Sequence, residues 1–174
     1  MKISITKIII FCFVIFSLSV FWRGLKINKN YDTKNLIGSR ISNFKLSEIN
    51  NNEQYISEKN LKKNKYTLIN FFASWCAPCR TEHKYLLNLS NTNKEIKIIG
   101  LNYKDKKINA NNFLNELGNP YDFVGKDIDG KISILFGIYG IPESILINNE
   151  LIVIKKIIGP IDKAQFNEIL KLIQ

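Results

Sequence analysis

The chain has 174 residues, 45% of them hydrophobic, three cysteines and a formal charge of +10 at pH 7. This length suits one domain with an appendage, the apolar content excludes a disordered chain, and three cysteines are too few for a disulfide-built scaffold. Lysine supplies 22 of the 25 basic residues, and isoleucine and asparagine, which share its AT-rich codons, are also abundant. The charge therefore indicates codon bias in preference to an arginine-rich nucleic-acid surface, and we expect no nucleic-acid partner.

The first predicted element is an apolar helix that crosses a membrane. Residues 8–22 carry no charge. Fifteen helical residues cover about 22 Å, and extension to residues 3–22 approaches the roughly 30 Å hydrocarbon core of a bilayer. Lys7 can then reach the headgroups, and Trp22 lies where an interfacial aromatic belongs. A cleaved signal peptide is the alternative. Ser17-x-Ser19 is a poor small-x-small cleavage site, and Phe21 and Trp22, which follow it at once, favour an uncleaved anchor.

Composition sets the remaining boundaries. Residues 27–39 are polar and lack hydrophobic periodicity, as is typical of a linker. We therefore expect a membrane anchor at residues 1–26, a linker at 27–39 and a folded domain at 40–174. Basic residues flank the apolar segment on both sides, so the positive-inside rule gives it no orientation.

The folded domain is predicted to alternate strands and helices. Strands are expected at residues 66–73, 95–103, 144–147 and 151–158, and helices at 81–89, 108–117 and after Asp162, which begins a capping box with Gln165. Ser57 and Glu58 predict the start of a short helix in a less clear region. The order predicts a parallel β-α-β unit followed by an antiparallel hairpin. The fold class is therefore α/β, with a central mixed sheet flanked by helices.

One motif carries the chemistry, the sequence WCAPC at residues 75–79, directly after a predicted strand. The N–H groups and dipole of a helix N-terminus stabilise a thiolate, the reactive form of cysteine. Pro78 suits the first helical turn. We expect Cys76 to face solvent and attack a partner disulfide, and Cys79 to resolve the mixed disulfide, as in a thiol-disulfide oxidoreductase. An inert disulfide and half a zinc site are the alternatives, but zinc needs four ligands and only His83, expected on the helix surface, lies nearby.

A second motif precedes the next-to-last predicted strand, at Ile141-Pro142. A proline cannot donate to a strand ladder, so its position at a central strand is unusual. A cis Ile141–Pro142 bond would account for it, because cis bonds are nearly confined to X–Pro. An ordinary loop proline is the alternative.

These motifs resemble the thioredoxin fold, and the likeness narrows to the CcmG/DsbE family, membrane-anchored thiol:disulfide interchange proteins of bacterial cytochrome c biogenesis. Four segments carry it: residues 76–83 (CAPCRTEH), 101–105 (LNYKD), 117–121 (LGNPY) and 137–143 (GIYGIPE). The likeness runs from about residue 36 to 174. WCxxC alone marks only the thioredoxin superfamily, whereas NYKD and GIYGIPE make the narrower resemblance specific.

The resemblance implies a periplasmic reductant, held by residues 3–22 in the bacterial inner membrane and without a cofactor or metal. It would take electrons from a membrane thiol transporter. It would pass them to the CxxCH disulfide of apocytochrome c, or to a thiol protein of the haem-ligation complex. The implied site has a redox-active Cys76–Cys79 disulfide and a cis Pro142 that lines a peptide groove. Its supporting residues are Trp75, Pro78, Glu82, Ile141, Pro142 and Glu143.

Glu82 and Glu143 match acidic residues that tune the thiols in that family. A carboxylate near a buried thiol can accept its proton, and a charged carboxylate raises the pKa of the thiol. Glu82 is equally compatible with an exposed first-turn residue that the helix dipole favours. Glu143 lies beside the proline, which favours a functional role.

Other functions stay open at this point. The same dithiol could serve a general periplasmic oxidant, because direction depends on a potential between about −270 and −120 mV. A non-catalytic module that holds apocytochrome c is a further alternative. A peroxidase of this fold should place threonine three residues before its reactive cysteine, where this chain has Ala73.

Overall fold

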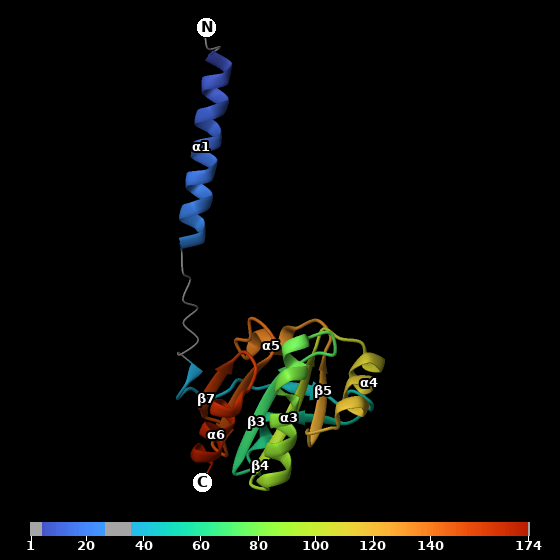
Figure 1. Cartoon of the computed structure of the whole chain (residues 1–174). Coiled ribbons are helices and arrows are strands. Elements are labelled where there is room, and N and C mark those ends of the chain that lie inside the picture. Colours follow the sequence, from blue (N-terminus) through green and yellow to red (C-terminus); the bar gives the residue numbers. More distant parts are fainter. Residues whose placement is uncertain (1–4, 27–35, 174) are drawn as a thin grey trace. The chain divides into compact units, whose positions relative to one another are not determined.

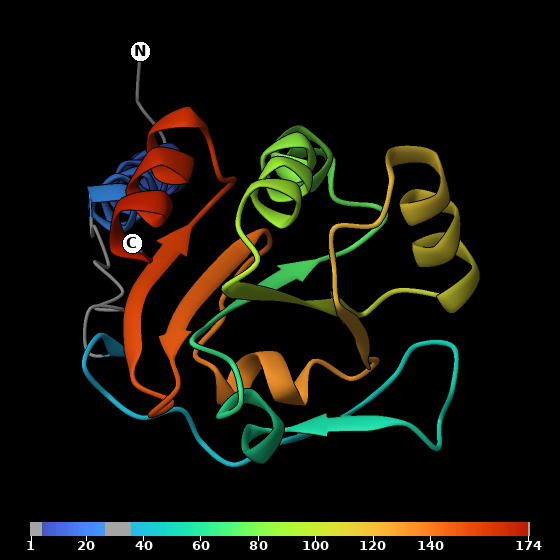
Figure 2. The same cartoon turned by 90° about the horizontal axis from the view of Figure 1, so that it is seen from below.

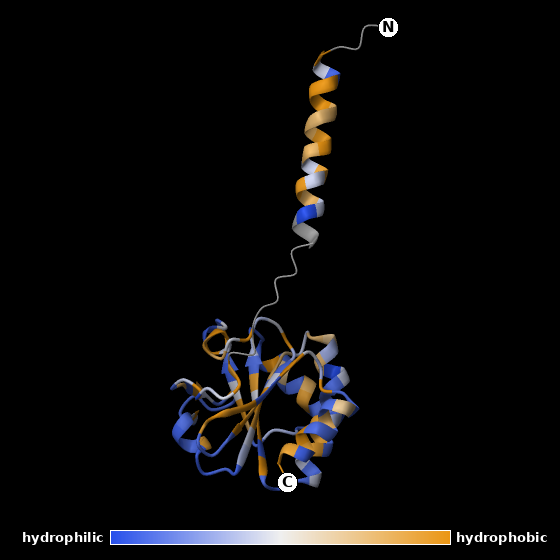
Figure 3. Ribbon diagram, turned by 90° about the vertical axis from the view of Figure 1, so that its left-hand side faces the viewer, coloured by the Kyte–Doolittle hydropathy of each residue, from blue (hydrophilic) through white to orange (hydrophobic). Residues whose placement is uncertain are grey.

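The computed structural model describes residues 5–26 and 36–173. The chain forms two compact units, residues 1–32 and 33–174. Within the first unit lies α1 (Ile5–Lys26), which Figure 3 shows as a largely hydrophobic helix. Its residues Ile5–Arg23 have a mean hydropathy of 2.3 and no buried share, so length and composition make this helix a candidate membrane span. The predicted linker at 27–39 falls mostly outside the described residues.

The second unit is built on a five-stranded mixed sheet (Figure 1). In the order β5-β4-β3-β6-β7, its strands are β5 (Phe123–Asp127), β4 (Ile96–Tyr103), β3 (Tyr66–Phe72), β6 (Glu143–Asn148) and β7 (Val153–Ile158). β4 pairs in parallel with β3 and β5, whereas β6 is antiparallel to β3 and β7. The predicted parallel unit, C-terminal hairpin and mixed sheet are confirmed.

Helices cover both faces of this sheet (Figure 2). One face carries α3 (Ala77–Thr92), α4 (Lys107–Leu117) and α6 (Lys163–Leu172). The other carries α2 (Glu58–Leu61), α5 (Lys131–Leu135) and a small antiparallel pair, β1 (Lys45–Ser47) and β2 (Tyr55–Ser57). Alternate residues of β3 supply the two cores: Leu68 and Phe72 join the first, Ile69 and Phe71 the second.

Local sequence explains several element ends. The Asp162 carboxylate accepts the Gln165 N–H at 2.8 Å and begins α6, as predicted. Gln165 Oε1 itself is buried with no hydrogen-bond partner among the described residues, so only half of the predicted capping box forms. The Ser57 N–H donates to Asn60 Oδ1 at 2.9 Å, and the short helix expected there is confirmed as α2.

Four elements were not predicted: β1, β2, β5 and α5. Their sequences are short, and β5 is interrupted by Gly125, so none shows a clear period. Gly125 is needed because β1 packs over β5: a Cβ atom at this position would lie 2.1 Å from Leu46 Cδ2. Tertiary packing therefore requires the glycine. In the sequence alone, a glycine at this position only weakens the prediction of a strand.

Candidate active site

The two cysteines of the WCAPC motif form a disulfide at the N-terminus of α3. The S–S distance is 2.05 Å and the Cα atoms lie 5.3 Å apart. Cys76 is the N-cap residue, and its Sγ accepts the Cys79 N–H at 3.2 Å. Cys76 is only 4% exposed and Cys79 1%, so the expectation that Cys76 faces solvent openly is wrong for this oxidised form. The preceding Trp75 is 59% exposed and marks the accessible side of the motif.

Glu82 is fully buried in the second turn of α3, which rules out the exposed reading of this residue. Its Oε1 accepts Asn70 Nδ2–H at 2.9 Å, and its Oε2 accepts the Ile161 N–H at 2.8 Å. Burial raises the pKa of the Glu82 carboxyl to about 7, although both hydrogen bonds act to lower it. This group therefore holds or releases a proton near neutral pH.

Asn70 connects Glu82 to two further buried side chains. It lies at the centre of β3, where its Nδ2 also donates to Ser144 Oγ at 3.0 Å and its Oδ1 accepts the Tyr121 hydroxyl at 2.8 Å. Burial, together with the nearby Glu82 carboxylate, raises the pKa of Tyr121 well above its ordinary value. Sequence reasoning missed Asn70, although one amide within the apolar run YTLINFF is the signal that points to it.

His83 is buried, and its predicted surface position is wrong. Its Nε2–H donates to the Gly118 carbonyl at 2.8 Å, and its ring meets the Phe113 ring edge-on at a centroid distance of 5.1 Å. Burial lowers the pKa of the imidazole. These contacts tie α3 to α4 and its C-terminal turn, which is a packing role.

The Ile141–Pro142 peptide bond is cis, as predicted. Ile141 packs against the hydrophobic cluster that contains both cysteines. Glu143 follows at the start of β6 and is 3% exposed. Its Oε1 accepts the N–H groups of Tyr139 and Gly140, each at 3.1 Å. One carboxylate thus holds the loop that leads into the cis proline.

Glu143 also forms a buried ion pair that sequence reasoning missed. Its Oε2 lies 3.0 Å from Lys156 Nζ, and the two side chains are 4% and 2% exposed. Lys156 comes from β7 and donates to the Gly137 carbonyl at 2.6 Å. The pair therefore makes hydrogen bonds to the backbone at both ends of the Gly137–Gly140 loop. In the sequence, Lys156 is one of 22 lysines and carries no distinguishing signal.

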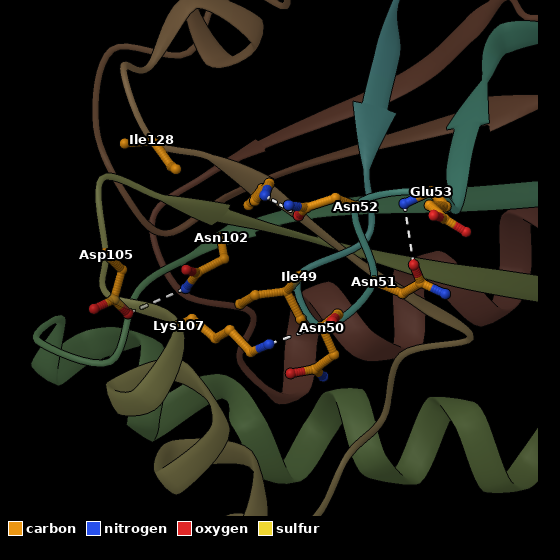
Figure 4. A pocket seen from close by; sticks show the side chains of 10 residues that line it. Ile49, Asn50, Asn51, Asn52, Glu53, Asn102, Asp105, Lys107 and Ile128 are labelled. Atoms are coloured by element: carbon orange, nitrogen blue, oxygen red, sulfur yellow. Dashed lines mark hydrogen bonds between the residues drawn. The ribbon is translucent and has the colours of Figure 1, made fainter.

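Two hollows border the active-site end of β4. The larger, about 440 Å³, is lined by the Asn50–Asn52 turn, Asn102, Asp105 and Lys107, among others (Figure 4). The second, about 430 Å³, is lined by Trp75, Lys104–Lys106, Asn109 and Ile128. Within residues 5–26 and 36–173, no group of three or more His, Cys, Asp and Glu side chains is arranged to hold a metal ion.

Comparison with known proteins agrees with this geometry. The Redoxin family model matches residues 36–173. The chain is 33% identical over 175 residues to the thiol:disulfide interchange protein DsbE of Escherichia coli K12, covering 98% of this chain and 94% of the relative. It is 37% identical over 148 residues to DsbE of Tatumella citrea, covering 81% and 77%. A solved thiol:disulfide interchange protein of the thioredoxin family from Chlorobium tepidum is 27% identical, with a TM-score of 0.65 and coverage of 78% and 95%.

Proposed function

This chain belongs to the Redoxin family and is a DsbE-like thiol:disulfide oxidoreductase, and from this premise we propose that it reduces disulfides during cytochrome c maturation. Its target would be the CxxCH disulfide of apocytochrome c, or a thiol protein of the haem-ligation complex. The four motif segments that resemble CcmG/DsbE proteins support this assignment. The observation that carries it is the Cys76–Cys79 disulfide at the start of α3, together with a cis-proline turn whose Ile141 packs against the hydrophobic cluster that contains both cysteines.

The proposed reaction starts from the dithiol form. The Cys76 thiolate bonds to one sulfur of the target disulfide, the target S–S bond breaks, and its second sulfur leaves as a thiolate. The Cys79 thiolate then attacks Cys76 Sγ, which releases the target as a dithiol and leaves the Cys76–Cys79 disulfide. Two electrons have passed to the target, and a membrane thiol transporter would restore the dithiol.

The other proposed site residues support these two sulfurs. Pro78 lies in the first turn of α3, at whose N-terminus the backbone N–H groups favour a thiolate. Glu82, with a pKa of about 7, would exchange protons with the deeper thiol. The exposed Trp75 and the turn at Ile141–Pro142 would contact the target, and Glu143 holds that turn in place. Residues 40–174 would form the catalytic domain in the periplasm, with residues 1–26 as the inner-membrane anchor and 27–39 as the linker.

A reduction assay tests this function. The full-length chain, reduced and in detergent, is mixed with a synthetic peptide whose CxxCH cysteines are oxidised, and peptide thiols are measured with time. We expect rapid release of thiols, and equilibration with glutathione should give a potential nearer to about −270 mV than to about −120 mV. A potential at the oxidising end would favour the oxidant alternative and contradict the proposal.

Cysteine variants identify the attacking sulfur. Cys76→Ser should abolish peptide reduction, because the nucleophile is absent. Cys79→Ser should retain attack but accumulate a mixed disulfide with the peptide, visible as a mass adduct, because nothing resolves it. In cells, normal haem attachment by the double variant would instead favour a module that only holds apocytochrome c.

A further inference from the structure

Asp105 gathers four hydrogen-bond donors on one carboxylate. Its Oδ2 accepts the Ser74 N–H at 2.6 Å and the Asn102 side-chain amide at 3.1 Å. Its Oδ1 accepts the Ser74 hydroxyl at 2.9 Å and the Lys106 N–H at 2.8 Å. A carboxylate with this many donors has one well-determined orientation. Asp105 belongs to the NYKD segment, to which the thiol chemistry assigns no role.

Sheet topology explains why this carboxylate reaches the active-site loop. β3 and β4 are parallel and register Phe72 opposite Asn102, so their carboxyl ends meet at the same edge of the sheet. Ser74 follows the end of β3 by two residues, and Asp105 follows the end of β4 by two residues. Figure 4 shows Asp105 linked to Asn102, which is buried. The carboxylate is therefore anchored on β4 and presented to β3.

The segment after β4 also holds Trp75, the residue directly before Cys76. Trp75 Nε1–H donates to the Lys104 carbonyl at 3.2 Å. Lys104 adopts a positive φ of 44°, and its N–H donates to the Asp127 carbonyl at 3.0 Å, which ties the loop to β5. Two consecutive residues before Cys76 are thus fixed by the segment after β4.

We propose that Asp105 is a positioning residue for thiol-disulfide exchange, whose carboxylate clamps Ser74 and so keeps Cys76 at the N-cap of α3. The inference rests on the proposed function, in which Cys76 is the attacking sulfur. Cys76 is joined to the clamp through Trp75 and through the turn in which its N–H donates to the Ala73 carbonyl at 3.2 Å. A loop released from Asp105 would let Cys76 leave the N–H groups that stabilise its thiolate.

The test compares Asp105→Ala with Asp105→Asn in the full-length chain. Asp105→Ala removes every acceptor and should slow reduction of the oxidised CxxCH peptide at least about tenfold, the scale of a small misplacement of a reacting group. Asp105→Asn keeps the shape but replaces one accepting oxygen with an NH2 group that faces a backbone N–H, so its rate should fall between those of Asp105→Ala and the wild type. The pH midpoint for alkylation of Cys76 by iodoacetamide should rise in Asp105→Ala and rise less in Asp105→Asn.

A second set of measurements keeps the proposal falsifiable if Asp105→Ala folds poorly. Ser74→Ala removes one of the four bonds and should shift the rate and the alkylation midpoint in the same direction, by less. In a Trp22→Phe background, acrylamide should quench Trp75 fluorescence more strongly in Asp105→Ala. Glu150→Ala, in the exposed turn between β6 and β7, is the matched control and should change neither the rate nor the midpoint.

Different results would contradict the positioning role of Asp105 and the proposed function. Wild-type rate and midpoint in both Asp105→Ala and Ser74→Ala would overturn the positioning role while peptide reduction persists. An inactive wild type, or an active Cys76→Ser variant, would contradict the proposed function itself.

Discussion

Replacement of Lys156 by methionine is expected to lower the free energy of unfolding by about 3–5 kcal/mol, because it leaves the Glu143 carboxylate buried without its cation. It also removes the donor to the Gly137 carbonyl. Urea denaturation of the full-length chain in detergent, followed by far-UV circular dichroism at pH 7, measures the loss. Peptide reduction should fall as well, since this ion pair holds the loop before the cis proline.

Two further variants compare the buried Glu143–Lys156 ion pair with a solvent-exposed ion pair. Lys65→Met breaks the pair between Lys65 and Glu95, which are 51% and 54% exposed, and should change the free energy of unfolding far less, because both charges are hydrated. The double variant Glu143→Gln/Lys156→Met should recover much of the loss. It removes the uncompensated charge, and the glutamine oxygen still accepts the two loop N–H groups. A loss in Lys156→Met no larger than that in Lys65→Met would show that the pair is not desolvated.

The contribution of Glu82 to the stability of the domain should fall as pH rises from about 4.5 to 7. Its folded-state pKa, about 7, lies above the ordinary value of 4.5, so in this interval the folded chain keeps a proton that the unfolded chain has released. The Glu82 contribution is therefore complete below pH 4.5 and is lost toward pH 7. The slope is about 1.4 kcal/mol per pH unit, or about 3 kcal/mol over the interval.

The difference between the wild type and Glu82→Gln isolates this contribution. Glutamine does not titrate, so the unfolding free energy of the wild type minus that of the variant should decrease from pH 4.5 to 7. Subtraction also cancels His83, whose lowered pKa makes stability rise with pH as the unfolded histidine loses its proton near pH 6.5. Glu150→Gln, an exposed substitution, should leave the pH dependence of the wild type intact. A constant difference for Glu82→Gln would show that Glu82 titrates normally.

Much of the fold was predictable because its signals are local. Apolar runs, helical spacing and the Asp162 cap each depend on residues close in the chain, and the elements they predicted in β3, β4, α4 and α6 are present. The reactive pair was predictable for the same reason. Cys76 and Cys79 are three residues apart, and a strand followed by a helix places them at a helix N-terminus whatever the rest of the chain does.

The contacts among the buried polar side chains of the candidate site depend on tertiary structure. The strand order places β6 beside β3 and so brings Ser144 to Asn70, although the two residues are 74 positions apart in the chain. β7 beside β6 places Lys156 against Glu143.

From the sequence alone came the thiol chemistry, the apolar N-terminal segment and the mixed α/β architecture. Only the tertiary structure decided which acids are buried, which cation faces Glu143, and that Asp105 holds the active-site loop. The physical reason is that periodicity and helix termini are properties of a few neighbouring residues. Burial and pairing are properties of the strand order, which no single segment encodes.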